Sequence, residues 1–245
     1  MKRYVKQMRK LMRIQEFFAF GGAKMTRCAV VCAASLNEQH VLKMQQGQGF
    51  EAILAVDGGY ERLRSCGLKP TLVLGDFDSL GFVPTDMPVL RFPEDKNESD
   101  LGLALTWAGE QGFDDVYVYG AFSGRIDHTI AALQELARAA ERFGHTRFLG
   151  VSECNSFVVL CSGQRFCIAP EAQTGALSQH NKDARSVSVL SLCDVSRGVN
   201  IAGLKYELSG AELRNRGSLG LSNEYTGKAA EISVQHGTIL VVLPL

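Results

Sequence analysis

Apolar positions in the first part of the chain fall into short runs separated by polar and helical stretches. The runs predict strands at residues 28–34, 52–59, 71–79 and 114–121. Helical spacing predicts one helix that begins at Ser99-Asp100 and a second over residues 126–144. The second helix is expected to bury four residues on one face, namely Ile130, Leu133, Leu136 and Ala140. Strands that alternate with helices indicate a parallel sheet covered on both faces.

The pattern changes after about residue 150, where no long helical period occurs. Short β-rich segments separated by Gly, Asn and Ser turns predict strands at 147–151, 156–162, 165–169, 186–192, 205–209, 231–235 and 238–245. The polar stretch 170–185 is predicted to be an exposed loop. The expected fold class is therefore α/β. It has a three-layer α/β domain with a mostly parallel sheet over residues 28–150, and a smaller all-β sandwich domain over residues 151–245.

The zero formal net charge hides two unlike parts of the chain. Residues 1–27 carry eight Lys/Arg side chains and one acidic residue, Glu16, so we interpret them as a basic N-terminal extension outside the fold. The remaining 218 residues carry 18 basic and 25 acidic side chains, and this acidic balance argues against a nucleic-acid partner. No run of 18 uncharged apolar residues occurs, so no membrane-spanning helix is expected.

The seven cysteines form no CxxC pair and fall mostly within apolar runs. This usage is typical of buried, reduced thiols in a cytoplasmic protein rather than of disulfides or a zinc site.

Carboxylates gather where the predicted strands end. Residues 51–127 hold 14 Asp/Glu against six Lys/Arg. Asp57 ends the second strand, Asp76 and Asp78 follow the third, Asp100 opens a helix, and Asp127 follows a glycine-containing turn. Ligands of open parallel sheets bind beyond these strand ends, and oxygen donors without nearby His or Cys favour Mg²⁺. Each aspartate could instead have a structural role. Asp57-Gly58-Gly59 also fits a turn, and Asp100 and Asp127 each fit the N-terminus of a helix.

The segment 119–125, with Gly120 and Gly124, predicts a strand-to-helix turn that a phosphate can approach closely. Arg125 stands beside it and is suited to grip a phosphate through two hydrogen bonds. Neither a P-loop nor a dinucleotide-binding motif occurs in the sequence. Phosphate binding without a P-loop, beside a Mg²⁺ carboxylate cluster, is the chemistry that these residues predict.

Several segments in this order resemble the thiamine pyrophosphokinase family. They are AVDGGYERL, LKPTLVLGDFDSL, DKNESDLGLAL and VYGAFSGRIDHTIAAL, followed by GLKYELSG and GSLGLSNEY in the second half. The resemblance covers about residues 28–245. It implies transfer of the terminal diphosphoryl group of ATP to the thiamine hydroxyl, which leaves AMP. It also implies an α/β catalytic domain, a thiamine-binding β-sandwich, and a homodimer with the active site at the interface.

The resemblance also implies roles for particular residues. Asp76, Asp78 and Asp100 match the magnesium-associated aspartates, and with Arg125 and Asp127 they form the implied catalytic set. The implied ATP-binding residues are Asp57, Gly58, Gly59, Gly120, Gly124, Arg125 and Asp127. The implied thiamine-binding residues are Ser99, Ser222, Asn223 and, as the aromatic that stacks on the vitamin, Tyr225.

Three other functions remain open from the residues alone. An apolar strand that ends in Asp-x-Asp also suits a Mg²⁺-dependent phosphohydrolase or a nucleotide-sugar transferase. A protein that senses thiamine or nucleotide without turnover is the alternative outside enzymes. Detection of AMP, inorganic phosphate or a sugar-nucleotide requirement distinguishes these functions.

Overall fold

The computed structural model describes residues 25–47, 49–77, 80–93, 97–173 and 185–245. A single ten-stranded sheet runs through the molecule in the order β12-β9-β14-β7-β6-β5-β1-β2-β3-β4. Its parallel part consists of β1 (Arg27–Val31), β2 (Ala52–Val56), β3 (Leu72–Gly75), β4 (Val89–Arg91), β5 (Asp115–Tyr119) and β6 (Arg147–Val151). The chain leaves β1 towards β2 and leaves β5 towards β6, so the strand order reverses between β1 and β5.

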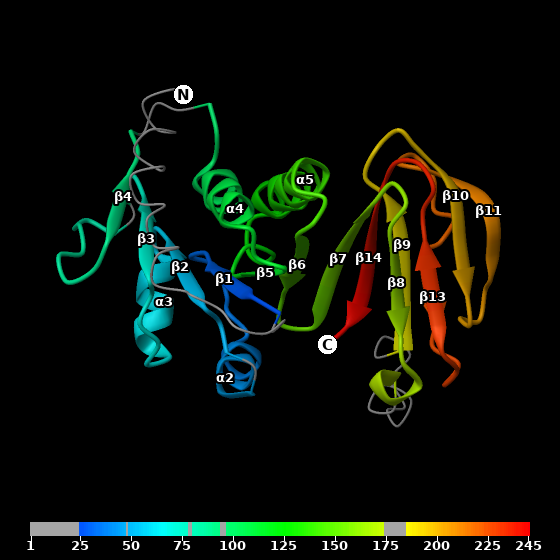
Figure 1. Cartoon of the computed structure of the whole chain (residues 1–245), viewed down its shortest axis with the longest axis horizontal. Helices are drawn as coiled ribbons and strands as arrows, with labels where there is room; N and C mark the ends of the chain where they lie inside the picture. The colour runs from blue at the N-terminus through cyan, green and yellow to red at the C-terminus, as the bar shows by residue number, and fades with distance from the viewer. Residues whose placement is uncertain (1–24, 48, 78–79, 94–96, 174–184) are drawn as a thin grey trace.

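Helices cover both faces of the parallel strands (Figure 1). On one face lie α4 (Asp100–Gln111) and α5 (Ile126–Arg142), and on the other lie α2 (Glu38–Gly47) and α3 (Gly59–Ser65). Alternate residues of one strand point to opposite faces, so Val30 packs beneath α4 and α5, whereas Val31 packs with α2 and α3. The predicted three-layer α/β arrangement is confirmed.

The second half of the chain forms a β-sandwich. Four strands extend the large sheet, namely β7 (Asn155–Cys161), β9 (Ser186–Ser191), β12 (Asn223–Glu224) and β14 (Thr238–Pro244). The facing sheet contains β8 (Arg165–Ile168), β10 (Val195–Ala202), β11 (Leu208–Arg214) and β13 (Ala230–Ser233). Alternating apolar residues such as Val189, Ile201 and Ile232 fill the space between the two sheets. The short 3₁₀ helix Pro170–Gln173 follows β8 within the stretch predicted to be an exposed loop, and Gln173 at its end is buried.

The predicted elements differ from the structure in several places. The sequence did not predict α2, α3, β4, β10 or the two-residue β12, because α2 and α3 are short and largely polar and β10 carries Arg197 and Gly198 among its apolar residues. The strand predicted at 205–209 begins only at Leu208 and runs to Arg214. Helix α5 was predicted, but Ile130 is 52% exposed instead of buried. The other predicted residues do face the core, since Leu136 and Ala140 are buried and Leu133 packs against it. Ala132, Ala137 and Ala139 complete the buried face.

The boundaries and the cysteines also differ in detail. Strand β1 begins at Arg27, within the range assigned to the extension, while the rest of that extension up to residue 24 lies outside the described residues. All seven cysteines are unpaired as expected, but Cys28 alone is buried and Cys154 and Cys167 are exposed. Among the described residues, no helix has the length and apolar character needed to cross a membrane.

Candidate active site

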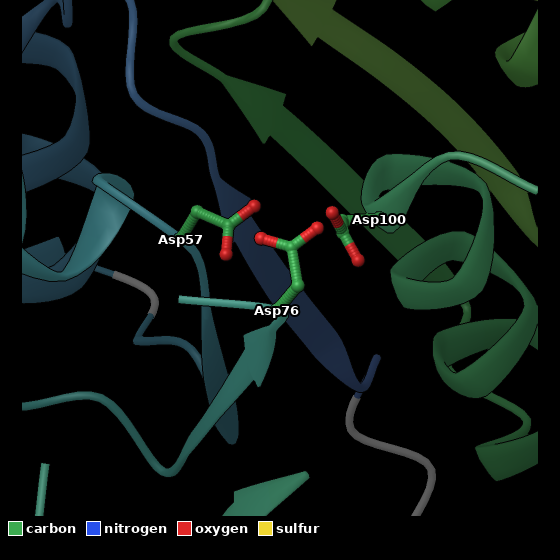
Figure 2. A group of neighbouring side chains, drawn as sticks. All are labelled: Asp57, Asp76 and Asp100. Atoms are coloured by element: carbon green, nitrogen blue, oxygen red, sulfur yellow. The ribbon is translucent and has the colours of Figure 1, made fainter. Parts of the chain in front are cut away.

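Three aspartates from separate segments converge beyond the carboxyl ends of the parallel strands. Asp57 directly follows β2, Asp76 directly follows β3, and Asp100 is the first residue of α4. One carboxylate oxygen from each lies within 4.8 Å of one from each of the others. Figure 2 shows the three side chains pointing toward one another. Three of the five aspartates that the sequence singled out therefore form one cluster, whereas Asp127 pairs with Arg125 outside it.

The Gly75-Asp76-Phe77 segment is shaped around the Asp57 side chain. A Cβ on Gly75 would lie 1.8 Å from Oδ1 of Asp57, so a side chain at this position would displace the carboxylate. The backbone N–H of Phe77 donates a hydrogen bond of 3.2 Å to the same Oδ1. Phe77 is buried and holds a left-handed backbone conformation with φ of 68°, which is costly for a residue other than glycine. The packed ring thus holds the turn that orients Asp57.

Asp57 itself starts the turn into α3. Its φ of 45° is also left-handed, and its backbone N–H donates to the carbonyl of Leu74 at 3.0 Å. Gly59 lies so close to β1 that a Cβ would sit 1.9 Å from the carbonyl oxygen of Val31. Gly59 therefore serves the close packing of α3 on the sheet, and this packing fixes the position of Asp57. Gly58 is the N-cap residue of α3.

The cluster perturbs the ionisation of Asp57. Burial, and then the negative charges of Asp100 and Asp76, raise the pKa of Asp57 to about 7, although the Phe77 N–H opposes the shift. Three adjacent carboxylates without a cation repel one another. The donor set is oxygen only, which is the set that Mg²⁺ prefers. The residues present therefore fit a magnesium ion.

Asp78, the third aspartate predicted to bind metal, lies outside the described residues. The strand predicted at 71–79 ends at Gly75, and Phe77 after it holds a left-handed backbone conformation.

The turn between β5 and α5 carries the predicted phosphate-binding residues at the reversal point of the sheet. A Cβ on Gly120 would lie 2.4 Å from the carbonyl oxygen of Cys32, so this glycine serves the packing of the β5 turn against the β1 turn. Gly124 has a φ of 80° and open space around it, which leaves its backbone accessible to a ligand. Arg125 and Asp127 are both exposed and form an ion pair of 2.6 Å at the start of α5.

Ser99 caps α4 rather than projecting freely from it. Its hydroxyl accepts a hydrogen bond of 3.0 Å from the N–H of Gly102, and this bond fixes the first turn of the helix that carries Asp100.

The Ser222-Asn223 motif lies far from the aspartates within one chain. Asn223 belongs to β12, at one edge of the ten-stranded sheet, whereas β3 is next to the other edge. Eight strand positions separate β12 from β3, which corresponds to roughly 38 Å along the sheet at about 4.8 Å per strand. One copy of the chain therefore does not bring Ser222 and Asp76 together.

An exposed tyrosine that the sequence did not single out, Tyr206, lies beside this motif. Tyr225 is only 9% exposed and packs in the sandwich core, whereas Tyr206 is 57% exposed. The buried amide of Asn223 accepts a hydrogen bond from the Tyr206 N–H at 2.9 Å and donates one to the Tyr206 carbonyl at 2.6 Å. Tyr206 lies just before β11, in a stretch that the sequence predicted to be a strand. Nothing in the sequence therefore indicated that Tyr206 is exposed and Tyr225 is buried.

Two family models match this chain in sequence order. "Thiamin pyrophosphokinase, catalytic domain" matches residues 47–146, which include all three clustered aspartates, and "Thiamin pyrophosphokinase, vitamin B1 binding domain" matches residues 177–239. The chain belongs to the thiamine pyrophosphokinase family. The resemblance inferred from the sequence is confirmed.

Curated relatives agree with this family. The thiamine pyrophosphokinase of Bacillus subtilis (strain 168) is 24% identical over 195 residues, which cover 77% of this chain and 85% of the relative. Thiamin pyrophosphokinase 1 of Caenorhabditis elegans is 25% identical over 165 residues, 64% of this chain and 63% of the relative.

Solved structures show the same fold at lower identity. The crystal structure of Bacillus subtilis thiamine pyrophosphokinase has a TM-score of 0.71 at 21% identity and covers 89% of this chain and 98% of its own. The yeast thiamin pyrophosphokinase has a TM-score of 0.66 at 11% identity and covers 95% of this chain and 90% of its own. The α/β half followed by a β-sandwich is thus the fold of solved thiamine pyrophosphokinase structures.

Proposed function

We propose that this protein transfers the diphosphoryl group of ATP to the hydroxyl of thiamine, giving thiamine diphosphate and AMP. The observation that carries the proposal is that one chain matches both halves of the family. The catalytic-domain match contains the converging Asp57, Asp76 and Asp100, and the vitamin B1 binding match contains Ser222 and Asn223.

The carboxylate cluster supports a magnesium-dependent reaction. Asp57, Asp76 and Asp100 would hold the ion, which when bound offsets negative charge on the phosphate oxygens of ATP. The main work of the protein residues is to position the reacting groups, because in-line phosphoryl transfer needs little covalent help. Arg125 would contact the phosphates once it turns away from Asp127, and the accessible backbone of Gly124 lies in the same turn.

A homodimer with shared sites is part of the same proposal. The distance across the sheet supports it, because thiamine held at Ser222 in one chain is out of reach of the aspartates of that chain. A second copy would place its Ser222 turn opposite the first copy's aspartates, and two-fold symmetry would then make two identical sites.

The exposed ring of Tyr206 is the aromatic that we propose for contact with thiamine, in place of Tyr225. Its exposure and its attachment to Asn223 support this choice. Lys205 lies over one face of the ring, 5.2 Å from its centroid, and forms an ion pair of 2.8 Å with Glu224. The other ring face remains the surface on which a flat, cationic thiazolium would stack.

A cytoplasmic location completes the proposal and is supported by the seven unpaired cysteines, since thiols stay reduced in that compartment. The phosphohydrolase, the nucleotide-sugar transferase and the sensor are not favoured. Neither of the first two explains the match to a vitamin B1 binding domain, and a sensor without turnover needs no converging carboxylates.

The test is a product assay with purified protein, ATP, Mg²⁺ and thiamine. We expect AMP and thiamine diphosphate to appear together, and no AMP to appear without thiamine. Release of ADP with thiamine monophosphate would contradict transfer of a diphosphoryl group, and release of inorganic phosphate without thiamine would indicate a phosphohydrolase.

A mixing experiment tests the shared site. One variant carries Asp76→Asn, and the other carries Tyr206→Ala with Ser222→Ala. Each is expected to be inactive alone. When equal amounts reassociate at random, half of the dimers are mixed and each mixed dimer contains one unaltered site, so about a quarter of the parent's sites should be restored. No recovery in dimers shown to have exchanged subunits would mean that each site is built within one chain.

A further inference from the structure

Charged side chains of α5 hold the segment of chain around Asp100. We propose that Glu135 and Arg138 are positioning residues for the Asp100 carboxylate, and that they set the affinity of the three-aspartate cluster for a divalent cation. The inference rests on the proposed function, because it takes Asp57, Asp76 and Asp100 to be the metal ligands.

Hydrogen bonds join α5 to the residues immediately before Asp100. The Ser99 hydroxyl, which caps α4, donates to Oε1 of Glu135 at 3.3 Å. The other oxygen of Glu135 accepts from Nε of Arg138 at 2.9 Å, and a second guanidinium nitrogen lies 2.7 Å from it. The remaining guanidinium nitrogen donates to Oε1 of Glu98 at 3.0 Å. Glu98 and Ser99 are therefore both fixed to α5.

Gly102 completes this contact on the other side of Asp100. A Cβ at this position would lie 2.7 Å from Nη2 of Arg138 and 2.8 Å from Oε2 of Glu135. The absence of a side chain at Gly102 is therefore what allows the guanidinium–carboxylate pair to lie against the first turn of α4. We call the group Glu98, Ser99, Glu135 and Arg138 the α5 clamp.

The clamp affects metal binding because it sets the direction in which the Asp100 carboxylate points. Because Asp100 opens α4, its carboxylate can meet those of Asp57 and Asp76 only when the first turn of the helix has one orientation. Mg²⁺ demands oxygen ligands at about 2.0–2.1 Å in near-octahedral geometry, so a small rotation of the turn removes a ligand. Groups that orient a metal ligand through hydrogen bonds typically change metal affinity by about 10–100-fold when removed.

The simpler interpretation is that the clamp only stabilises the packing of α5 on α4. The chain contains a matched pair for that comparison, since Arg142 of α5 lies 3.5 Å from Glu110 near the far end of α4. The Arg142 and Arg138 side chains are similarly exposed, at 51% and 44%. Loss of Arg142 removes an ion pair between α5 and α4, whereas loss of Arg138 removes the ion pair between α5 and Glu98, two residues before α4 begins. Of the two arginines, Arg138 is the one that contacts the segment around Asp100.

The experiment measures Mn²⁺ binding to the full chain by electron paramagnetic resonance, with Mn²⁺ as the probe for the magnesium site. The proteins compared are the parent, Arg138→Gln, Gly102→Ala and Arg142→Gln. We expect Arg138→Gln to bind Mn²⁺ about 10-fold more weakly than the parent, and Arg142→Gln to bind as the parent does. Gly102→Ala should bind Mn²⁺ more weakly, because its Cβ displaces the Arg138–Glu135 pair from the first turn of α4.

Turnover supplies a second measurement that a merely structural role would not change. In Arg138→Gln the Mg²⁺ concentration needed for half-maximal rate should rise, while kcat at saturating Mg²⁺ should approach that of the parent. Arg138→Lys should recover only part of the affinity, since an ammonium cannot bridge Glu98 and Glu135 as a planar guanidinium does.

The outcomes separate the inference from the proposed function. If the parent binds Mn²⁺ and forms AMP, but Gly102→Ala and Arg138→Gln bind Mn²⁺ within twofold of it, the positioning role is wrong. Equal weakening in Arg138→Gln and Arg142→Gln would also overturn it in favour of helix packing. If Arg138→Gln does not fold, Gly102→Ala alone decides. A parent that neither binds Mn²⁺ nor forms AMP would contradict the proposed function itself.

Discussion

Asp57, Asp76 and Asp100 are arranged at some cost to the fold. Asp57 itself and the neighbouring Phe77 hold left-handed backbone conformations, and burial together with like charges raises the pKa of Asp57 to about 7. Such features persist only where the surrounding structure enforces them, and they are typical of functional sites. A structural aspartate in a turn or a helix cap would instead contribute to stability.

Replacement of Asp76 separates these two possibilities. In metal-free buffer Asp76→Asn should melt at or above the parent, because one charge is removed from the repulsive cluster at similar side-chain volume. Turnover should fall about 100-fold or more, because the metal site loses a charged ligand. Thermal melts and the AMP assay give the two values. A lower melting temperature with normal turnover would mean that Asp76 is a structural residue.

The ionisation of Asp57 predicts how stability depends on pH in metal-free protein. Its pKa rises from 3.8 in the unfolded chain to about 7 in the fold, so the folded state binds the proton more tightly. The resulting stabilisation is fully present below pH 3.8 and is lost as the pH rises towards 7. After allowance for solvent screening of this half-buried group, we expect the loss to be about 1–2 kcal/mol.

The measurement is the free energy of unfolding from pH 4.5 to 7.5 with a chelator present. The parent should lose stability relative to Asp57→Asn over this interval, because the amide cannot ionise. Saturating Mg²⁺ should remove the difference, since the cation favours the ionised carboxylate. Parallel profiles for the two proteins without metal would show that Asp57 titrates at its ordinary pKa.

At the scale of the elements, one buried ion pair ties the parallel strands together at the end opposite the active site. Asp115 of β5 is 1% exposed and accepts two hydrogen bonds from Arg147 of β6, at 2.6 and 2.9 Å. Arg27 of β1 lies 3.6 Å from the same carboxylate. A single residue thus joins three neighbouring strands.

We expect Asp115→Ala to lower the free energy of unfolding by about 1.5–3 kcal/mol, because it leaves the largely buried Arg27 guanidinium without this carboxylate, whereas Arg147 is half exposed and can be solvated. Glu212→Gln is the control, since Glu212 pairs with Arg197 at 3.1 Å on the surface, where loss of a pair costs about 0–1 kcal/mol. Denaturant unfolding of both variants gives the comparison. Equal effects would mean that solvent screens the Asp115 pair despite its burial.

At the scale of the whole molecule, exposed apolar residues border both halves of the proposed shared site. Ile126 and Ile130 are 73% and 52% exposed next to Arg125, and Leu221 is 53% exposed next to Ser222. Apolar surface beside functional residues is typical of an interface with another protein. The proposed homodimer would cover both places.

Substitution of Ile126 and Ile130 by Ser should therefore weaken the dimer while the monomer keeps its fold, because both side chains are exposed in one chain. Sedimentation should show dissociation at concentrations where the parent remains a dimer, and turnover per chain should fall on dilution. Phe82→Ser, which removes a 43% exposed ring elsewhere, is the control. A dimer of unchanged affinity would place the interface on another surface.

The sequence alone determined the family and most strands of the parallel sheet and the sandwich. Apolar runs of strand length and the helical period of α5 are local signals, and they survive because burial of these runs is the main source of stability. The strand-end aspartates were also visible, since carboxylates directly after apolar runs must lie at one edge of a parallel sheet. Short, polar α2 and α3 carried no comparable signal.

Tertiary structure decided what depends on contacts between distant segments. Only the fold shows that Gly75 is needed to make room for Asp57, that Ile130 faces outward, and that Tyr206 is exposed while Tyr225 is buried. It also places Ser222 at the opposite end of the sheet from the aspartates. The physical reason is that exposure and proximity are set by strand order and by the close approach of backbones, and neither quantity is encoded in the periodicity of a single segment.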